Sequence, residues 1–106
     1  MAGTGLYQLP LLVHPENGLD DLIPGYLAHR QDDVAAIDEA LTAGDLAPVQ
    51  SIGHSMKGSG GGYGFDGITE IGLRLEEAAR DGEADTARAA LADLRDYLSN
   101  VEVHYG

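Results

Sequence analysis

The sequence contains no cysteine and no tryptophan, and it is poor in basic residues, with 6 lysines and arginines against 18 aspartates and glutamates. The absence of cysteine excludes disulfides, thiolate chemistry and cysteine-ligated metal, and it fits a reducing compartment. The formal net charge of −12 argues against a nucleic-acid partner, because binding a phosphate backbone requires a basic surface. The same charge disfavours docking on anionic lipid, so no membrane partner is expected.

Long hydrophobic runs are absent as well. No segment approaches the roughly 18 consecutive apolar residues that a membrane-spanning helix needs. The run Leu9–Val13 is too short for the core of a signal peptide, and no basic residue precedes it. The chain has 106 residues, of which 43% are hydrophobic, and this suits one globular domain with a single modest core. We therefore expect a soluble, cytoplasmic, single-domain protein.

Residues 1–18 are predicted to form an N-terminal arm, because they hold three glycines and two prolines and follow no regular period. The apolar residues of this arm either pack back on the body of the protein or belong to a disordered leader, and the sequence leaves both possibilities open. Residues 19–106 form the predicted folded domain.

The first segment with a helical period begins at about Leu19 and ends at a stop signal, Gly44. Asp20 or Asp21 is the expected N-cap, and Pro24 then falls in the first turn, where a missing N–H costs little. Arg30 interrupts the apolar stripe, and we expect it to reach the surface or to pair with a carboxylate. The stripe consists of Ile23, Leu27, Arg30, Val34, Ile37 and Leu41.

The second helical segment has Asp45 as its expected N-cap and is unusually rich in glycine after Met56. Each glycine inside a helix costs about 1 kcal/mol relative to alanine. Either the helix frays after Gly58, or the glycines allow another segment to approach closely. Its apolar face consists of Leu46, Val49, Ile52, Met56 and Tyr63.

Two further helices are predicted, one from Asp66 to the stop signal Asp81-Gly82 and one that extends to Val101. Their apolar stripes are Ile68, Ile71, Leu75 and Ala78 or Ala79 in the third, and Ala87, Ala90, Leu91, Leu94, Leu98 and Val101 in the fourth. Four amphipathic helices with short connections and no strand-like alternation predict an all-α fold, an antiparallel up-down four-helix bundle.

His54 stands out among the polar residues of the second helix. At about 100° per residue it falls opposite the apolar face, so it is expected to face solvent. Imidazole is a usable nucleophile near neutral pH, and Lys57, the only lysine in the sequence, lies one turn ahead, where it can meet the negative charge of an acquired phosphoryl group. The other residues on this face are polar or small, namely Gln50, Ser51, Gly58 and Gly61.

The stretch from His54 through Lys57, Gly58 and Ser59, followed by Gly64, resembles the signature of histidine-containing phosphotransfer (HPt) domains. The resemblance extends from about Leu19 to Val101. It implies a four-helix bundle that carries a phosphoryl group between receiver domains of a two-component phosphorelay. By the same resemblance, His54 is the phosphoacceptor at Nε2, Lys57 stabilises the phosphoryl group, and Gly58 leaves room for the partner.

In this family a glutamine or similar polar residue on the following helix often hydrogen-bonds the other ring nitrogen, and the matching position here is Glu76. A carboxylate that accepts from Nδ1–H would fix the tautomer and make Nε2 more nucleophilic. The alternative is a solvated surface carboxylate, and the sequence does not choose between them. Gly72, one turn earlier, would permit tight helix packing.

No glycine-rich loop in the sequence has the spacing of a Walker motif, so we expect neither ATP binding nor autophosphorylation and no cofactor in this chain. The Mg²⁺ that transfer requires is expected in the acidic pocket of the partner receiver. The implied partners are receiver domains of response regulators and of a hybrid histidine kinase, and the chain is expected to be a monomer. Candidate docking residues are Leu22, Tyr26, Gln50, Ser51 and Gly61.

Two other functions are compatible with a helical bundle. The first is a module that docks on receiver domains and inhibits or sequesters them without carrying phosphate. The second is a metal-dependent bundle enzyme, but a di-iron site of that kind needs a Glu-x-x-His pair on each of two helices, and no glutamate stands three residues before any histidine. No metal site is therefore expected.

Overall fold

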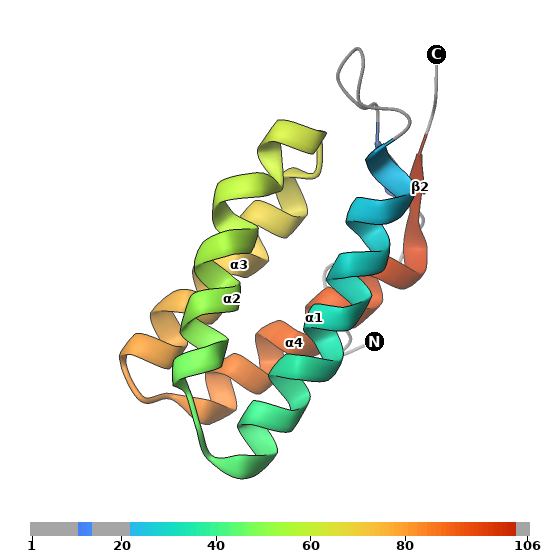
Figure 1. The fold of residues 1–106 in the computed structure, drawn as a ribbon. Coiled ribbons are helices and arrows are strands. Elements are labelled where there is room, and N and C mark those ends of the chain that lie inside the picture. The colour runs from blue at the N-terminus through green and yellow to red at the C-terminus, as the bar shows by residue number, and fades with distance from the viewer. Residues whose placement is uncertain (1–10, 14–21, 104–106) are drawn as a thin grey trace.

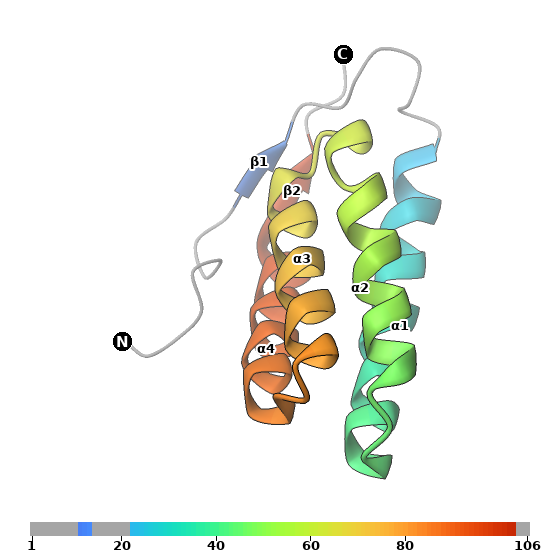
Figure 2. The same cartoon turned by 90° about the vertical axis from the view of Figure 1, so that its left-hand side faces the viewer.

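The computed structural model describes residues 11–13 and 22–103. Its main elements are four helices, α1 (Ile23–Ala43), α2 (Ala47–Ser59), α3 (Asp66–Arg80) and α4 (Ala84–Asn100). The chain reverses direction at each short connection, and every helix packs against its two neighbours in the order α1–α2–α3–α4 (Figures 1 and 2). The predicted antiparallel four-helix bundle is confirmed.

The helix ends follow the local signals of the sequence in most places. Gly44 adopts the left-handed conformation, φ 75°, and ends α1 as predicted, while Gly82, φ 73°, follows the last turn of α3. The carboxylate of Asp45 accepts a hydrogen bond from the backbone N–H of Ala47 at 3.2 Å, but the N-cap of α2 is Leu46, one residue later than predicted. Pro24 lies in the first turn of α1, and the proposed caps Asp20 and Asp21 lie outside the described residues.

The end of α4 differs from the prediction. The helix stops at Asn100, and Val101 is extended, with φ −70° and ψ 133°. Val101–Val103 forms the short strand β2, which pairs in parallel with β1 (Leu11–Val13). Valine at alternate positions favours extended backbone, and this pairing joins segments far apart in sequence, so local periodicity could not show it. Three residues of the predicted arm thus pair with β2 directly after α4, and the rest of the arm lies outside the described residues.

The core is built from the predicted apolar stripes. The largest fully buried side chains come from all four helices and from the connection before α3, and they are Ile23, Ile37, Val49, Met56, Phe65, Ile68, Ile71, Leu75 and Leu94. Tyr26 and Tyr97 are also buried. Burial of this apolar surface holds the helices together.

Arg30 interrupts the stripe of α1 without exposing the core. Its Nε lies 2.7 Å from the carboxylate of Asp33, and its guanidinium carbon lies 4.6 Å from the ring centroid of Tyr26. Burial raises the pKa of Asp33, and the neighbouring Arg30 opposes that rise. The expected carboxylate partner of Arg30 is therefore Asp33, and the pair lies on the side of α1 that faces α2 because the guanidinium also reaches Ser59.

Close approach explains two of the glycines on and beside α2. A Cβ at Gly53 would lie 2.7 Å from the backbone nitrogen of Glu76, and a Cβ at Gly72 would lie 2.5 Å from the backbone nitrogen of Lys57. No side chain larger than hydrogen fits at either position, so α2 and α3 touch backbone to backbone. Gly58 is different, because a Cβ there would have no atom of the described chain within 4 Å beyond its own helix.

This contrast gives a direct test of the α2–α3 contact. Gly72→Ala should destabilise the protein by about 1–3 kcal/mol, the usual cost of overpacking, because the added methyl group forces the two backbones apart. Gly58→Ala should be neutral or stabilising by up to about 1 kcal/mol, because alanine favours helix and meets open space. Urea denaturation of both variants measures the difference, and equal stability of the two would contradict the close contact.

Candidate functional site

His54 presents its imidazole to solvent from the middle of α2. Its side chain is 70% exposed, as the helical period predicted. Gly58, one turn further along α2, contributes no side chain and has open space around it. An approaching molecule therefore meets no bulky side chain at the position one turn beyond the ring.

Glu76 of α3 lies directly beside His54. Its Oε2 is 2.8 Å from Nδ1 of the imidazole, and its side chain is only 14% exposed. The backbone contact at Gly53 and Gly72 brings α3 close enough for a glutamate side chain to reach across. Glu76 is thus a partner of His54 and not a free surface carboxylate.

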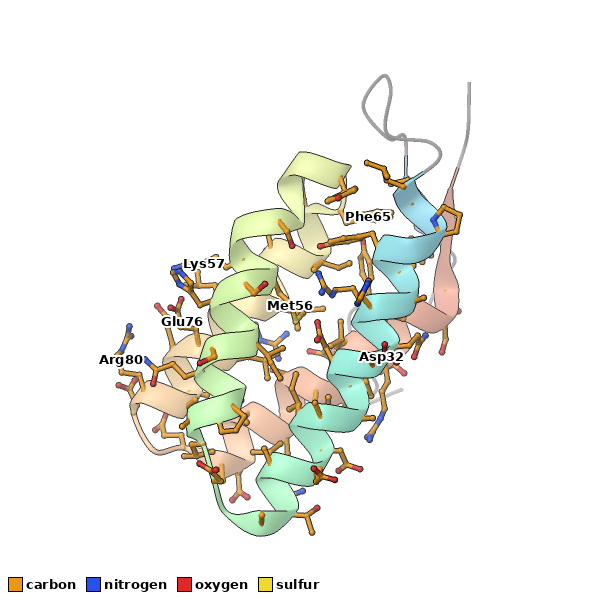
Figure 3. The ribbon with its side chains drawn as sticks, viewed as in Figure 1. Asp32, Met56, Lys57, Phe65, Glu76 and Arg80 are labelled. Carbon is orange, nitrogen blue, oxygen red and sulfur yellow. The ribbon has the colours of Figure 1, made fainter. Side chains whose placement is uncertain are left out.

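Lys57 binds the second oxygen of the same carboxylate. Its Nζ is 2.7 Å from Oε1 of Glu76, and Figure 3 shows Lys57 and Glu76 projecting together on the side of α2 away from α1. The sequence placed Lys57 on the face of His54 but did not reveal this ion pair. Its spacing of three residues from His54 was the available signal, since two donors one turn apart on a helix can share one acceptor.

The electrostatics of the three residues fix the proton positions. Hydrogen bonds from Lys57 and then from His54 hold the pKa of Glu76 below its ordinary value, so Glu76 is a carboxylate at neutral pH. A carboxylate only accepts hydrogen bonds. The hydrogen in the His54–Glu76 bond therefore belongs to Nδ1, and in neutral imidazole the lone pair is on Nε2, on the side of the ring away from Glu76.

Comparison with known proteins identifies the family of the chain. The family model described as Hpt domain matches residues 21–104. The chain belongs to the Hpt domain family. It is accordingly a phosphotransfer module of two-component phosphorelays, in which Hpt domains interact with receiver domains. Searches of curated proteins and of solved structures gave no match.

The candidate docking residues of this Hpt domain lie on and just after α2 and at the start of α1. Gln50, Ser51 and Gly61 are exposed on and just after α2. Leu22, 51% exposed, lies at the start of α1, beside a hollow of about 320 Å³ lined by Leu22, Gly25, Tyr26, His29, Arg30 and Tyr63. The α1 side also holds Phe65, whereas Lys57 and Glu76 project away from α1 (Figure 3).

Tyr26 is more deeply buried than the other docking candidates. Its side chain is 7% exposed, stacks on Tyr63 with ring centroids 4.1 Å apart, and shares a hydrogen bond of 2.9 Å with the hydroxyl of Ser59. It joins α1 to the end of α2 and offers a partner little more than one edge of the hollow. The period of α1 contained this signal, because Tyr26 stands three residues after the buried Ile23.

Leu73 of α3 is an exposed hydrophobic residue that the sequence analysis overlooked. It is 40% exposed and stands outside the apolar stripe of its helix, three residues before Glu76. An apolar residue on the polar face of an amphipathic helix was the signal that could have drawn attention to it.

The described part of the Hpt domain contains no group of three or more histidine, aspartate or glutamate side chains placed to hold a metal ion. His14 and His104 lie outside the described residues. None of the described helices is long and apolar enough to cross a membrane.

The lowered pKa of Glu76 predicts how stability depends on pH. Because the folded-state pKa lies below the ordinary 4.5, ionised Glu76 contributes stability above that value and loses it as the pH falls through the lowered pKa. We expect the difference in unfolding free energy between wild type and Glu76→Gln to be largest near neutral pH and to shrink below about pH 4.

Urea denaturation at a series of pH values measures this difference. Glu77→Gln is the matched control, because Glu77 is the exposed neighbour in the same helix and its replacement removes the same charge. A difference for Glu76→Gln that stays constant down to strong acid would contradict the ion pairing.

Proposed function

We propose that this Hpt domain carries a phosphoryl group on Nε2 of His54 between aspartates of receiver domains. The observation that carries the proposal is the 2.8 Å hydrogen bond from Nδ1 of His54 to Glu76 in a side chain that is 70% exposed. This bond directs the unprotonated Nε2 outward, where the aspartyl phosphate of a partner can reach it.

In the proposed reaction the lone pair of Nε2 attacks the phosphorus of the aspartyl phosphate. The Nε2–P bond forms, the bond from phosphorus to the aspartate oxygen breaks, and its electron pair leaves with the carboxylate. Lys57, one turn from His54, supplies positive charge to the phosphoryl oxygens. Its ammonium group then exchanges some or all of its contact with Glu76 for contact with these oxygens. In this proposal the receiver supplies Mg²⁺, and the reaction requires no cofactor and no nucleotide site of the Hpt domain itself.

The proposed partners are receiver domains of response regulators and of a hybrid histidine kinase, met by a monomeric Hpt domain in the cytoplasm. The absence of cysteine fits a reducing compartment. The net charge of −12 disfavours nucleic acid and anionic lipid, and it favours receivers whose docking surface has a neutral or basic rim. Gln50, Ser51 and Gly61 surround the approach to His54, and Leu22 offers an apolar contact beside α1.

Incubation with a phosphorylated receiver and Mg²⁺ tests the site. Wild type should acquire one acid-labile, base-stable phosphate, because phosphohistidine has that stability, and His54→Gln should acquire none. The label is followed with radioactive phosphate and located by mass spectrometry of the intact chain. Binding and inhibition of the receiver without any label on wild type would favour the docking-only function instead.

Access to His54 can be tested at Gly58. Gly58→Leu should slow phosphoryl transfer by about 10- to 100-fold, because a side chain one turn from the imidazole keeps the partner aspartate out of its reacting position. Gly58→Ala should have a smaller effect in the same direction. Single-turnover transfer from the receiver measures the rates, and urea denaturation checks that both variants remain folded. An unchanged rate in Gly58→Leu would show that a partner does not approach over this position.

A further inference from the structure

The contact between His54 and Glu76 also bears on how the phosphoryl group leaves. We propose that Glu76 holds the hydrogen on Nδ1 while His54 is phosphorylated, so that transfer to the second receiver releases a neutral imidazole and takes no proton from solvent. This inference rests on the proposed function, and it concerns the second transfer step and not the first.

The chemistry of the second step sets the requirement. An oxygen of the accepting aspartate forms a bond to phosphorus, the Nε2–P bond breaks, and its electron pair returns to Nε2. If Nδ1 still carries its hydrogen, the product is neutral imidazole. If Nδ1 has lost it, the product is imidazolate, a much stronger base and therefore a much poorer leaving group. The protonation of Nδ1 thus controls how readily the phosphoryl group departs.

The geometry keeps Glu76 in place to hold that hydrogen. One oxygen of the carboxylate lies 2.8 Å from Nδ1 and the other 2.7 Å from Nζ of Lys57. The backbone of Glu76 is fixed by the contact with Gly53, and its side chain is 14% exposed. The nitrogen that reacts is Nε2, so phosphorylation leaves the Nδ1 side of the ring and its charge-assisted hydrogen bond undisturbed.

A carboxylate acts differently here from an amide. Glutamine can turn either its carbonyl oxygen or its NH₂ group toward Nδ1, so it can pair with the nitrogen whether or not the hydrogen is present. Ionised glutamate only accepts, and it pairs with Nδ1 only when the hydrogen is there. Glu76 therefore favours the protonated state of Nδ1 at every stage of the relay, and a glutamine at this position would not.

Among the charged groups near the site, Glu76 is the one that holds the hydrogen on Nδ1 of His54. On α2, Lys57 binds the carboxylate itself. On α3, Glu77 is exposed, and Arg80 lies further along the helix beyond Glu76 (Figure 3), 3.7 Å from Asp81. The ion pairs Arg74–Asp93 and Arg95–Asp38 join α3 to α4 and α4 to α1. Among the described residues, His54 and Lys57 are the two that form ion pairs with Glu76.

The test compares wild type, Glu76→Gln and the control Glu77→Gln. Each protein is phosphorylated with phosphoramidate, a small donor that needs no receiver, and transfer to an unphosphorylated receiver with Mg²⁺ is then followed between about pH 6 and about pH 8.5. Nitrogen-15 NMR of the phosphohistidine ring reports whether Nδ1 carries a hydrogen at each pH. Because the receiver has its own pH dependence, each rate is divided by that of Glu77→Gln at the same pH.

Wild type should keep Nδ1 protonated throughout this range, and its relative rate should not change with pH. Glu76→Gln should lose the Nδ1 hydrogen within the range, and its relative rate should fall by about tenfold for each pH unit above that point. A merely structural role for Glu76 would lower the rate by one factor at every pH, and parallel pH profiles with equal Nδ1 protonation would overturn the inference.

The two proposals fail in different ways. If neither phosphoramidate nor a phosphorylated receiver labels His54 of wild type, the carrier function fails and the inference fails with it. If wild type is labelled and transfers its phosphoryl group, but with the same pH profile as Glu76→Gln, the carrier function stands and the inference alone is wrong.

Discussion

The close contact between α2 and α3 is the constraint on which the site depends. Hydrogen is the only side chain that fits at Gly53 and Gly72, where a Cβ would lie 2.5–2.8 Å from the nearest atoms of the opposite backbone. This approach fixes both the distance and the register between the two helices. Glu76 stands one turn after Gly72, and His54 directly follows Gly53, so the same contact that packs the bundle brings the carboxylate to the imidazole. His54 is therefore positioned by the packing of α2 against α3.

One carboxylate serves two donors in this arrangement. Glu76 holds the imidazole in one tautomer through Oε2 and holds Lys57 through Oε1. In the proposed reaction an incoming phosphoryl group would compete with Glu76 for the ammonium group of Lys57, but not for Nδ1, which lies on the far side of the ring from Nε2. The two contacts thus have separate effects. The orientation of the imidazole ring depends on its hydrogen bond to Oε2, whereas the positive charge available to the phosphoryl group depends on how far Lys57 leaves Oε1.

The sequence predicted most of the fold because the apolar residues of each helix repeat at the helical period and because Gly44 and Gly82 stop helices locally. The exposure of His54 followed from the same period. The contact of His54 with Glu76 did not, because it depends on the register between two helices, which the pattern of either helix alone does not determine. The strand at Val101 escaped prediction for a related reason, as it pairs with β1 from the other end of the chain. Tyr26 is more buried than a docking candidate is expected to be, because its ring packs in the core and its hydroxyl shares a hydrogen bond with Ser59.

The glycines of α2 show how one composition can serve two physical purposes. Gly53 is required by packing, since anything larger would push α3 away, whereas Gly58 has open space around it and alanine there would favour the helix. A residue that costs about 1 kcal/mol in a helix, and that no internal contact requires, is explained if something outside the chain needs the space. Because these glycines weaken α2 as an isolated helix, its order depends on packing against α3. Loss of the α2–α3 contact would therefore displace His54 and the carboxylate of Glu76 relative to each other, so the arrangement of the site depends on an intact bundle.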